Sequence, residues 1–250
     1  LNTAAQATSS KGAKNVIING DFDIWQRNIT QTANGYGSDD RWRNDNSLTT
    51  KVHTQETFTL GQTDVPNNPK FYSRSTVTSV ANAGTYVFKY QRIENVSTFA
   101  GQSATLSFYA KADANKNIAV EFVQDFGIGG APSGANFGIN VTTIALTTVW
   151  QKFTVSVNLP SITGKTLGTS GDFLQIGFWM DSGSNYNNRN NSLGQQSGTF
   201  DIAQVQFEKG STDTEFEMRT KGQELELCMR YYEVIGGDNF YNYITMMQCR

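Results

Sequence analysis

Residues 104–110 read ATLSFYA, residues 118–126 read IAVEFVQDF and residues 174–180 read LQIGFWM. In each stretch the large apolar side chains occupy every second position. Alternate residues of an extended chain point to opposite faces, so this spacing predicts strands with one face toward a core. Further strands are expected at 15–19, 48–59, 71–80, 85–95, 149–157 and 199–208.

The segments between these strands are rich in Gly, Asn, Asp and Ser. Parallel sheets need helical crossovers, and no helical spacing of apolar residues occurs before residue 220. The sequence therefore predicts an all-β fold, either a sandwich or a barrel. Two longer stretches, 127–140 and 181–198, are predicted to be surface loops, or plain solvated connectors.

The pattern changes at both ends of the chain. Residues 1–14 have no apolar period and are expected to be a flexible lead-in to a sandwich over 15–215. Thr220 and Gln223 have the spacing of a capping box, which predicts a helix over 221–232 within a C-terminal extension, 216–250. Residues 240–247 look like the start of another strand. Apolar residues occur almost up to the last residue of the sequence. We therefore expect the chain to be a segment of a longer protein.

Charge and motifs exclude several functions. Twenty Lys and Arg against 22 Asp and Glu give a net charge of −2, without the positive field that nucleic acids require. Apolar runs fall far short of the roughly 20 residues that cross a membrane. His53 is the single histidine, and the sequence has no nucleophile elbow, phosphate-binding loop or zinc-ligand cluster. A carboxylate pair could still hydrolyse glycosides, but no pair is singled out, so we predict a non-enzymatic protein.

Three aromatic residues fall on the predicted solvent side of their strands. Trp179 alternates with Phe178, Tyr109 with Phe108, and Trp150 with Val149. Large rings on a solvent face need a use or a cover. They could form a platform for carbohydrate, an interface between subunits, or a surface covered by a loop. Trp179, Tyr109 and Trp150 are accordingly the candidate carbohydrate-binding residues.

Asp201 is out of phase with its strand, because it shares the parity of Ala203, Val205 and Phe207. Either a β-bulge shifts the phase near residue 202, or the carboxylate points inward. An inward carboxylate needs an arginine or a cation as partner. No cofactor is required by the sequence, but Asp21, Asp23 and Asp201 are candidate ligands for a structural calcium ion.

Six short motifs follow one another along the chain. They are residues 16–27 (VIINGDFDIWQR), 39–42 (DDRW), 106–112 (LSFYAKA), 205–210 (VQFEKG), 214–217 (TEFE) and 224–232 (ELELCMRYY). Taken together and in this order, they resemble the receptor-binding regions of bacteriophage tail fibres and tail spikes. The similarity is to fibres of phages that infect Gram-negative hosts, including Acinetobacter. Residues 15–210 also resemble the jelly-roll carbohydrate-binding modules attached to bacterial glycosidases.

These resemblances imply a jelly-roll sandwich, a homotrimer and a place in the virion, in the phage tail beside other tail proteins. They also imply a ligand, which is the capsule or lipopolysaccharide of the host surface. In such modules a structural calcium lies near the first strand and an acid of the last strand, where Asp23 and Asp201 stand here. Three functions remain open: an adsorption module, a tail-spike depolymerase acting on capsule, and a purely structural virion piece.

Overall fold

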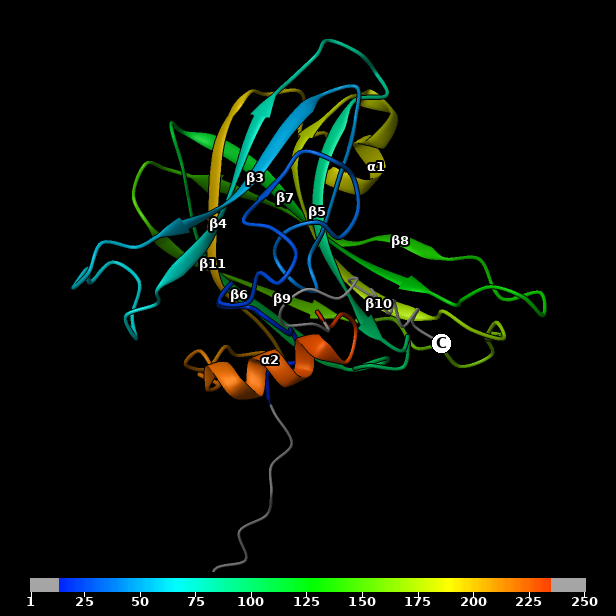
Figure 1. Ribbon diagram of the computed structural model, residues 1–250. Coiled ribbons are helices and arrows are strands. Elements are labelled where there is room, and N and C mark those ends of the chain that lie inside the picture. The colour runs from blue at the N-terminus through cyan, green and yellow to red at the C-terminus, as the bar shows by residue number, and fades with distance from the viewer. Residues whose placement is uncertain (1–13, 235–250) are drawn as a thin grey trace, which may run out of the picture.

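The computed structural model describes residues 14–234, which form two antiparallel β-sheets packed face to face (Figure 1). The predicted antiparallel jelly-roll β-sandwich is confirmed. In spatial order, the six-stranded sheet contains β1 (Thr30–Gln31), β3 (Thr50–Thr57), β4 (Phe71–Thr78), β11 (Gly198–Lys209), β6 (Ser103–Ala112) and β9 (Gln151–Asn158). The five-stranded sheet contains β2 (Arg43–Ser47), β5 (Tyr86–Glu94), β10 (Phe173–Ser182), β7 (Lys116–Asp125) and β8 (Asn136–Leu146).

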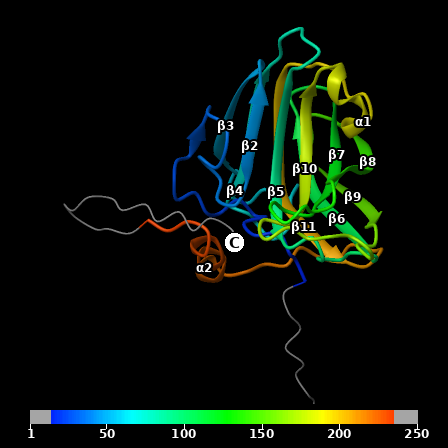
Figure 2. The same ribbon diagram turned by 90° about the vertical axis from the view of Figure 1, so that its right-hand side faces the viewer.

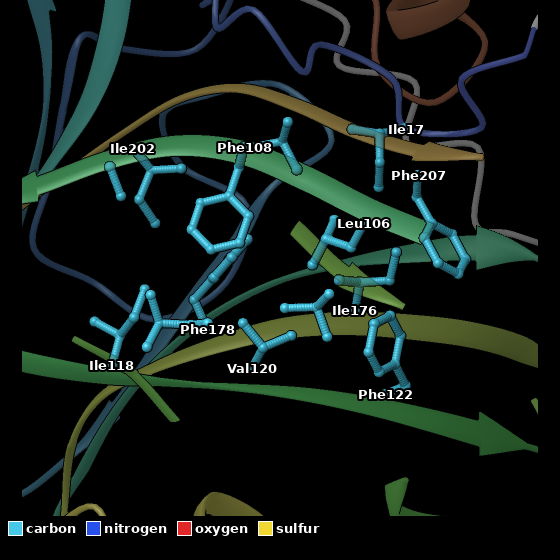
Figure 3. Close-up of a cluster of buried hydrophobic side chains, with 14 of the residues drawn as sticks. Ile17, Leu106, Phe108, Ile118, Val120, Phe122, Ile176, Phe178, Ile202 and Phe207 are labelled. Atoms are coloured by element: carbon cyan, nitrogen blue, oxygen red, sulfur yellow. The ribbon is translucent and has the colours of Figure 1, made fainter. Parts of the chain in front are cut away.

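The core lies between the sheets and is built from alternate residues of the central strands. Leu106 and Phe108 of β6 point toward Phe122 of β7 and Phe178 of β10 (Figure 3). The rings of Phe108 and Phe178 meet edge to face, 5.0 Å apart between centroids. All four side chains are fully buried, as their period of two predicts.

Two predicted boundaries are wrong. Residues 15–19 do not form a strand, although the Val16 amide donates to the Phe207 carbonyl of β11 at 3.0 Å. The side chains of Asn15 and Asn19 bind the backbone carbonyls of Val205 and Ile24. The predicted loop 127–140 ends early, because β8 begins at Asn136. Two shifts of register against β7 interrupt β8, which explains why its alternation is not visible in the sequence.

The second predicted loop, 181–198, contains two short helical turns. These are η1 (Ser184–Tyr186) and α1 (Asn187–Asn190). They lie on the outer side of the five-stranded sheet, beside β10, β7 and β8 (Figure 2).

Strand β5 is unusual because its inner side carries polar residues. Lys89 is completely buried, and its ammonium group pairs with Asp39 and donates to Asn44 Oδ1 at 3.0 Å. Gln91 is also buried, and its side chain both accepts from and donates to the backbone of Ile18 at 2.8 Å. A buried charge needs such a partner, so β5 depends on residues more than 40 positions away.

The predicted C-terminal helix is present as α2 (Lys221–Met229), and its capping box of Thr220 and Gln223 is confirmed. In Figure 1 it lies below the sandwich. Glu224 accepts a hydrogen bond from the Asn19 amide, and Arg219 donates to the carbonyl of Ile17 at 3.0 Å. The helix is therefore fastened to the first segment of the chain.

The two residues after α2 extend this attachment. The guanidinium of Arg41 lies 3.3 Å from the centre of the Tyr231 ring, and that of Arg27 lies 3.5 Å from the Tyr232 ring. Within residues 14–234, no helix is long and apolar enough to cross a membrane. Most of the predicted lead-in, 1–14, and the whole of the strand predicted at 240–247 lie outside the described residues.

Candidate functional site

A continuous row of aromatic rings lies on the outer face of the five-stranded sheet. Tyr86, Phe88 and Tyr90 project outward from β5, and Trp179 projects from β10 opposite Phe88. Phe88 stacks on Trp179 at 4.3 Å and on Tyr90 at 5.0 Å between ring centroids. A Cβ atom at Gly177 would lie 2.0 Å from the Phe88 ring, so only glycine allows Phe88 to lie flat across β10.

Two further rings stand at the sides of this face and are open to solvent. Tyr36, which precedes β2, is 38% exposed, and Phe137 of β8 is 52% exposed. Four spaces of about 4.8 Å between strands separate β2 from β8, so the face is about 19 Å wide. The guanidinium of Arg43 lies 5.9 Å from the ring centres of both Tyr36 and Tyr90, which links the side ring to the row.

Buried Glu121 of β7 organises the other half of the face. Its carboxylate accepts two hydrogen bonds from Arg189 at 2.7 and 2.8 Å, and one from Trp179 Nε1 at 2.9 Å. The Gly138 amide donates a fourth bond at 2.9 Å. Arg189 lies 4.5 Å from the Phe137 ring centre and 5.1 Å from that of Trp179. One fixed carboxylate thus orients both rings and the arginine between them.

The remaining polar groups of the face come from β2, β5 and β10. Asp45 Oδ2 accepts hydrogen bonds from Arg43 Nε and from the Tyr90 hydroxyl, both at 2.9 Å. Burial and then the Asp45 charge raise the pKa of Tyr90, so its hydroxyl stays protonated. Arg92 Nε donates to Gln175 Oε1 at 3.3 Å.

Phe88, Tyr90 and Trp179 are buried, so the exposed aromatic surface of this face comes from Tyr36 and Phe137 and in part from Tyr86 and Tyr186. Aromatic faces pack against apolar C–H surfaces, while guanidinium and amide groups supply hydrogen-bond donors in fixed directions. Two carboxylates of the face, Asp45 of the edge strand β2 and Glu121 of β7, accept hydrogen bonds from arginine.

The structure places the three predicted aromatic residues on two different faces. Trp179 lies in the row described above but is only 2% exposed, because the ring of Tyr186 covers it at 5.5 Å. Tyr109 and Trp150 lie on the outer face of the six-stranded sheet. There Trp150 packs 5.2 Å from the Phe58 ring, beside the loop that leads from β3 to β4. The three residues therefore do not form one platform, and both tryptophans are covered by neighbouring segments of the chain.

The phase change in β11 comes from a bulge, one of the two predicted solutions. The register against β6 shifts between Ala203 and Gln206. Asp201 consequently lies on the outer side, where Arg74 holds it with two hydrogen bonds of 2.8 and 2.9 Å and Lys111 approaches to 3.8 Å. The carboxylate still has an arginine as partner, which had been expected only for the other alternative, an inward-pointing Asp201.

Asp21 and Asp23 lie elsewhere, in a small pocket with Glu224 and Arg219. The pKa of Asp21 is raised to about 7 by burial, by Asp23 and by Glu224. One oxygen of each aspartate is buried without a hydrogen-bond partner among residues 14–234. Across that part of the chain, no three acidic, histidine or cysteine side chains are grouped to hold a metal. The predicted set of Asp21, Asp23 and Asp201 is therefore not assembled, and the residues do not fit a three-carboxylate calcium site.

Sequence reasoning missed most of the aromatic face. A signal was present in residues 86–92, where Tyr86, Phe88, Tyr90 and Arg92 share one parity. The other side of the strand contains Lys89 and Gln91 beside Val87 and Ile93. The sequence therefore does not show which side of β5 faces the core. The side rings Tyr36 and Phe137 had no signal, because β2 and β8 were not predicted.

No model of a known protein family and no curated protein matches the chain. A CBM4 structure matches with 20% identity and a TM-score of 0.42, over 77% of this chain and 98% of the other. A putative sugar-binding protein from Bacteroides thetaiotaomicron matches with 16% identity and a TM-score of 0.46, over 78% and 100%. The enzymatically active domain of tailspike protein 4 of bacteriophage CBA120 matches with 12% identity and a TM-score of 0.45, over 79% of this chain and 22% of that one. No functional conclusion about this chain follows from similarities of this size.

Proposed function

We propose that the chain is a non-catalytic adsorption module of a phage tail fibre, and that it binds a polysaccharide of the host surface. The observation that carries the proposal is the outer face of the five-stranded sheet. Exposed rings at both sides, Tyr36 and Phe137, flank a stacked aromatic row, and arginine and glutamine donors lie between them.

The place in the virion rests on the sequence motifs rather than on this geometry. The order of residues 16–27, 106–112 and 224–232 resembles phage fibres, which implies a homotrimer attached to other tail proteins. Three copies would present three faces to one surface, so weak individual contacts would combine into a tight attachment.

The binding face is tested by removing its exposed rings. Tyr36→Ala and Phe137→Ala should each weaken binding of host polysaccharide about 2- to 13-fold, the equivalent of roughly 0.5–1.5 kcal/mol for one aromatic contact. Phe71→Ala is the matched control, because this half-buried ring begins β4 in the other sheet. Binding is measured by calorimetry, with the melting temperature of each variant as a check on folding.

Two results would count against the proposal. If Phe71→Ala weakened binding as much as both face variants, the five-stranded sheet would not be the site. If the purified protein shortened the capsule chains, it would be a depolymerase rather than an adsorption module.

A further inference from the structure

Arg92 lies on the outer face of the five-stranded sheet, near the end of β5. It is two residues from Tyr90 on β5, so both side chains point outward, and its cross-strand neighbour on β10 is Gln175. The next row of the same face contains Arg43, Tyr90, Gly177 and Glu121 from four adjacent strands. Arg92 is therefore surrounded by groups already placed in the candidate site.

The guanidinium of Arg92 is held in one orientation. Its carbon lies 4.1 Å from the centre of the Phe173 ring and 5.5 Å from that of Tyr90. Its Nε donates to Gln175 Oε1 at 3.3 Å, and its backbone carbonyl accepts from Arg41 Nη2 at 2.7 Å. A planar group fixed by an amide and a ring loses little entropy when its remaining N–H groups bind a ligand.

Arg92 also differs from the other two arginines of the face in its charge balance. Arg43 pairs with Asp45, and Arg189 pairs with Glu121. Among residues 14–234, no carboxylate lies within 4.0 Å of the Arg92 guanidinium.

Two acidic residues of the face lie across from Phe173, and neither forms an ion pair with Arg92. Glu94, two residues along β5, pairs with Arg230, and Asp125 of β7 accepts a hydrogen bond from the Gly127 amide at 2.9 Å. The chain as a whole carries a charge of −2, so an arginine without an ion-pair partner here does not come from a general excess of basic residues.

From these observations we infer that the face binds an acidic polysaccharide, and that Arg92 recognises the carboxylate of a uronic-acid-type sugar. This inference rests on the proposed function, since it names the class of sugar that the same face takes. The two outer nitrogens of a guanidinium match the two oxygens of a carboxylate in a bidentate pair.

The test uses a panel of bacterial capsular polysaccharides, each in its native form and after chemical reduction of its carboxylates to alcohols. The wild-type protein should bind at least one uronate-containing member and lose about 10- to 100-fold in affinity when that member is reduced. Arg92→Gln should lose a similar factor on the native form and little on the reduced form. Arg92→Lys should recover only part of the lost affinity. Lysine keeps the positive charge but lacks the two parallel N–H groups of the guanidinium.

Lys209→Gln is the control, since it removes one positive charge from the end of β11 in the other sheet and should leave binding unchanged. Melting temperatures confirm that each variant is folded. Two results would overturn the inference while leaving polysaccharide binding intact. The protein could prefer neutral or sulfated polysaccharides of the panel, or Arg92→Gln could lose the same affinity for the native and the reduced forms. Binding to no member in any form would instead refute the proposed function itself.

Discussion

Arg189→Met should destabilise the protein by about 2–4 kcal/mol, because it leaves the carboxylate of Glu121 buried without its cation. The Glu121 side chain is 0% exposed, and Arg189 supplies two of its four hydrogen bonds. Breaking one partner of a buried ion pair costs about 3–5 kcal/mol. The Arg189 side chain is 23% exposed, so solvent screens part of the interaction and the expected cost is lower, about 2–4 kcal/mol.

The assay is urea unfolding, followed by tryptophan fluorescence, on four proteins that form a double-mutant cycle. Glu121→Gln removes the charge but keeps an acceptor for Trp179 Nε1, so Glu121→Gln/Arg189→Met should be more stable than Arg189→Met alone. The control is Arg230→Met, because the Arg230–Glu94 pair is exposed and its loss should cost less than about 1 kcal/mol.

A destabilisation no larger than that of the Arg230 control would refute the reasoning. So would a double variant whose loss equals the sum of the two single losses, because Glu121 and Arg189 would then act independently. The same variants should bind polysaccharide more weakly, since Arg189 lies against both the Phe137 and the Trp179 ring.

Two other predictions concern residues outside the aromatic face. Trp150→Ala should cost about 2–4 kcal/mol in urea unfolding, because it removes a half-buried ring from Phe58 and Tyr72, and polysaccharide binding should stay unchanged. Burial and the neighbouring acids raise the pKa of Asp21 to about 7, so the folded state holds this proton more tightly and stability falls as the pH rises from about 4 through 7. Asp21→Asn should therefore gain up to about 4 kcal/mol over wild type above pH 7 and almost nothing below pH 4, in urea unfolding at both pH values. If added calcium prevents the fall in stability of the wild type above pH 4, and a chelator brings that fall back, Asp21 and Asp23 bind the ion. A stability gain of Asp21→Asn that does not depend on pH would contradict the pKa argument.

The sandwich was predictable because its central strands obey a simple alternation. One parity is entirely apolar in β6, over 118–122 in β7 and over 174–180 in β10, and burial between two sheets requires that pattern. Strand β8 was not predictable, because its shifts of register against β7 remove the alternation from the sequence.

The binding face was hidden for a different reason. The inner side of β5 contains Lys89, whose charge is balanced by Asp39 from a distant part of the chain. A local reading of residues 86–94 cannot include that partner, so it cannot tell the core side of β5 from the side that carries Phe88 and Tyr90. Likewise, the position of Trp179 on the outer face was readable, but its cover by Tyr186 depends on the fold of residues 184–190.

The attachment of α2 to the first segment of the chain determines how the protein would carry mechanical load. Asn15 and Gly20 bind the backbone of β11 near Val205, and Arg219 holds the carbonyl of Ile17, so the two ends of the described chain meet at one end of the sandwich. Tension applied at residues 14 and 234 would pass through these contacts over a short path. Arg230 and Tyr231 also contact β5, through Glu94 and through Arg41, which binds the Arg92 carbonyl. Part of the tension would therefore reach the strand that carries Arg92, so pulling on the chain would load one side of the candidate binding face.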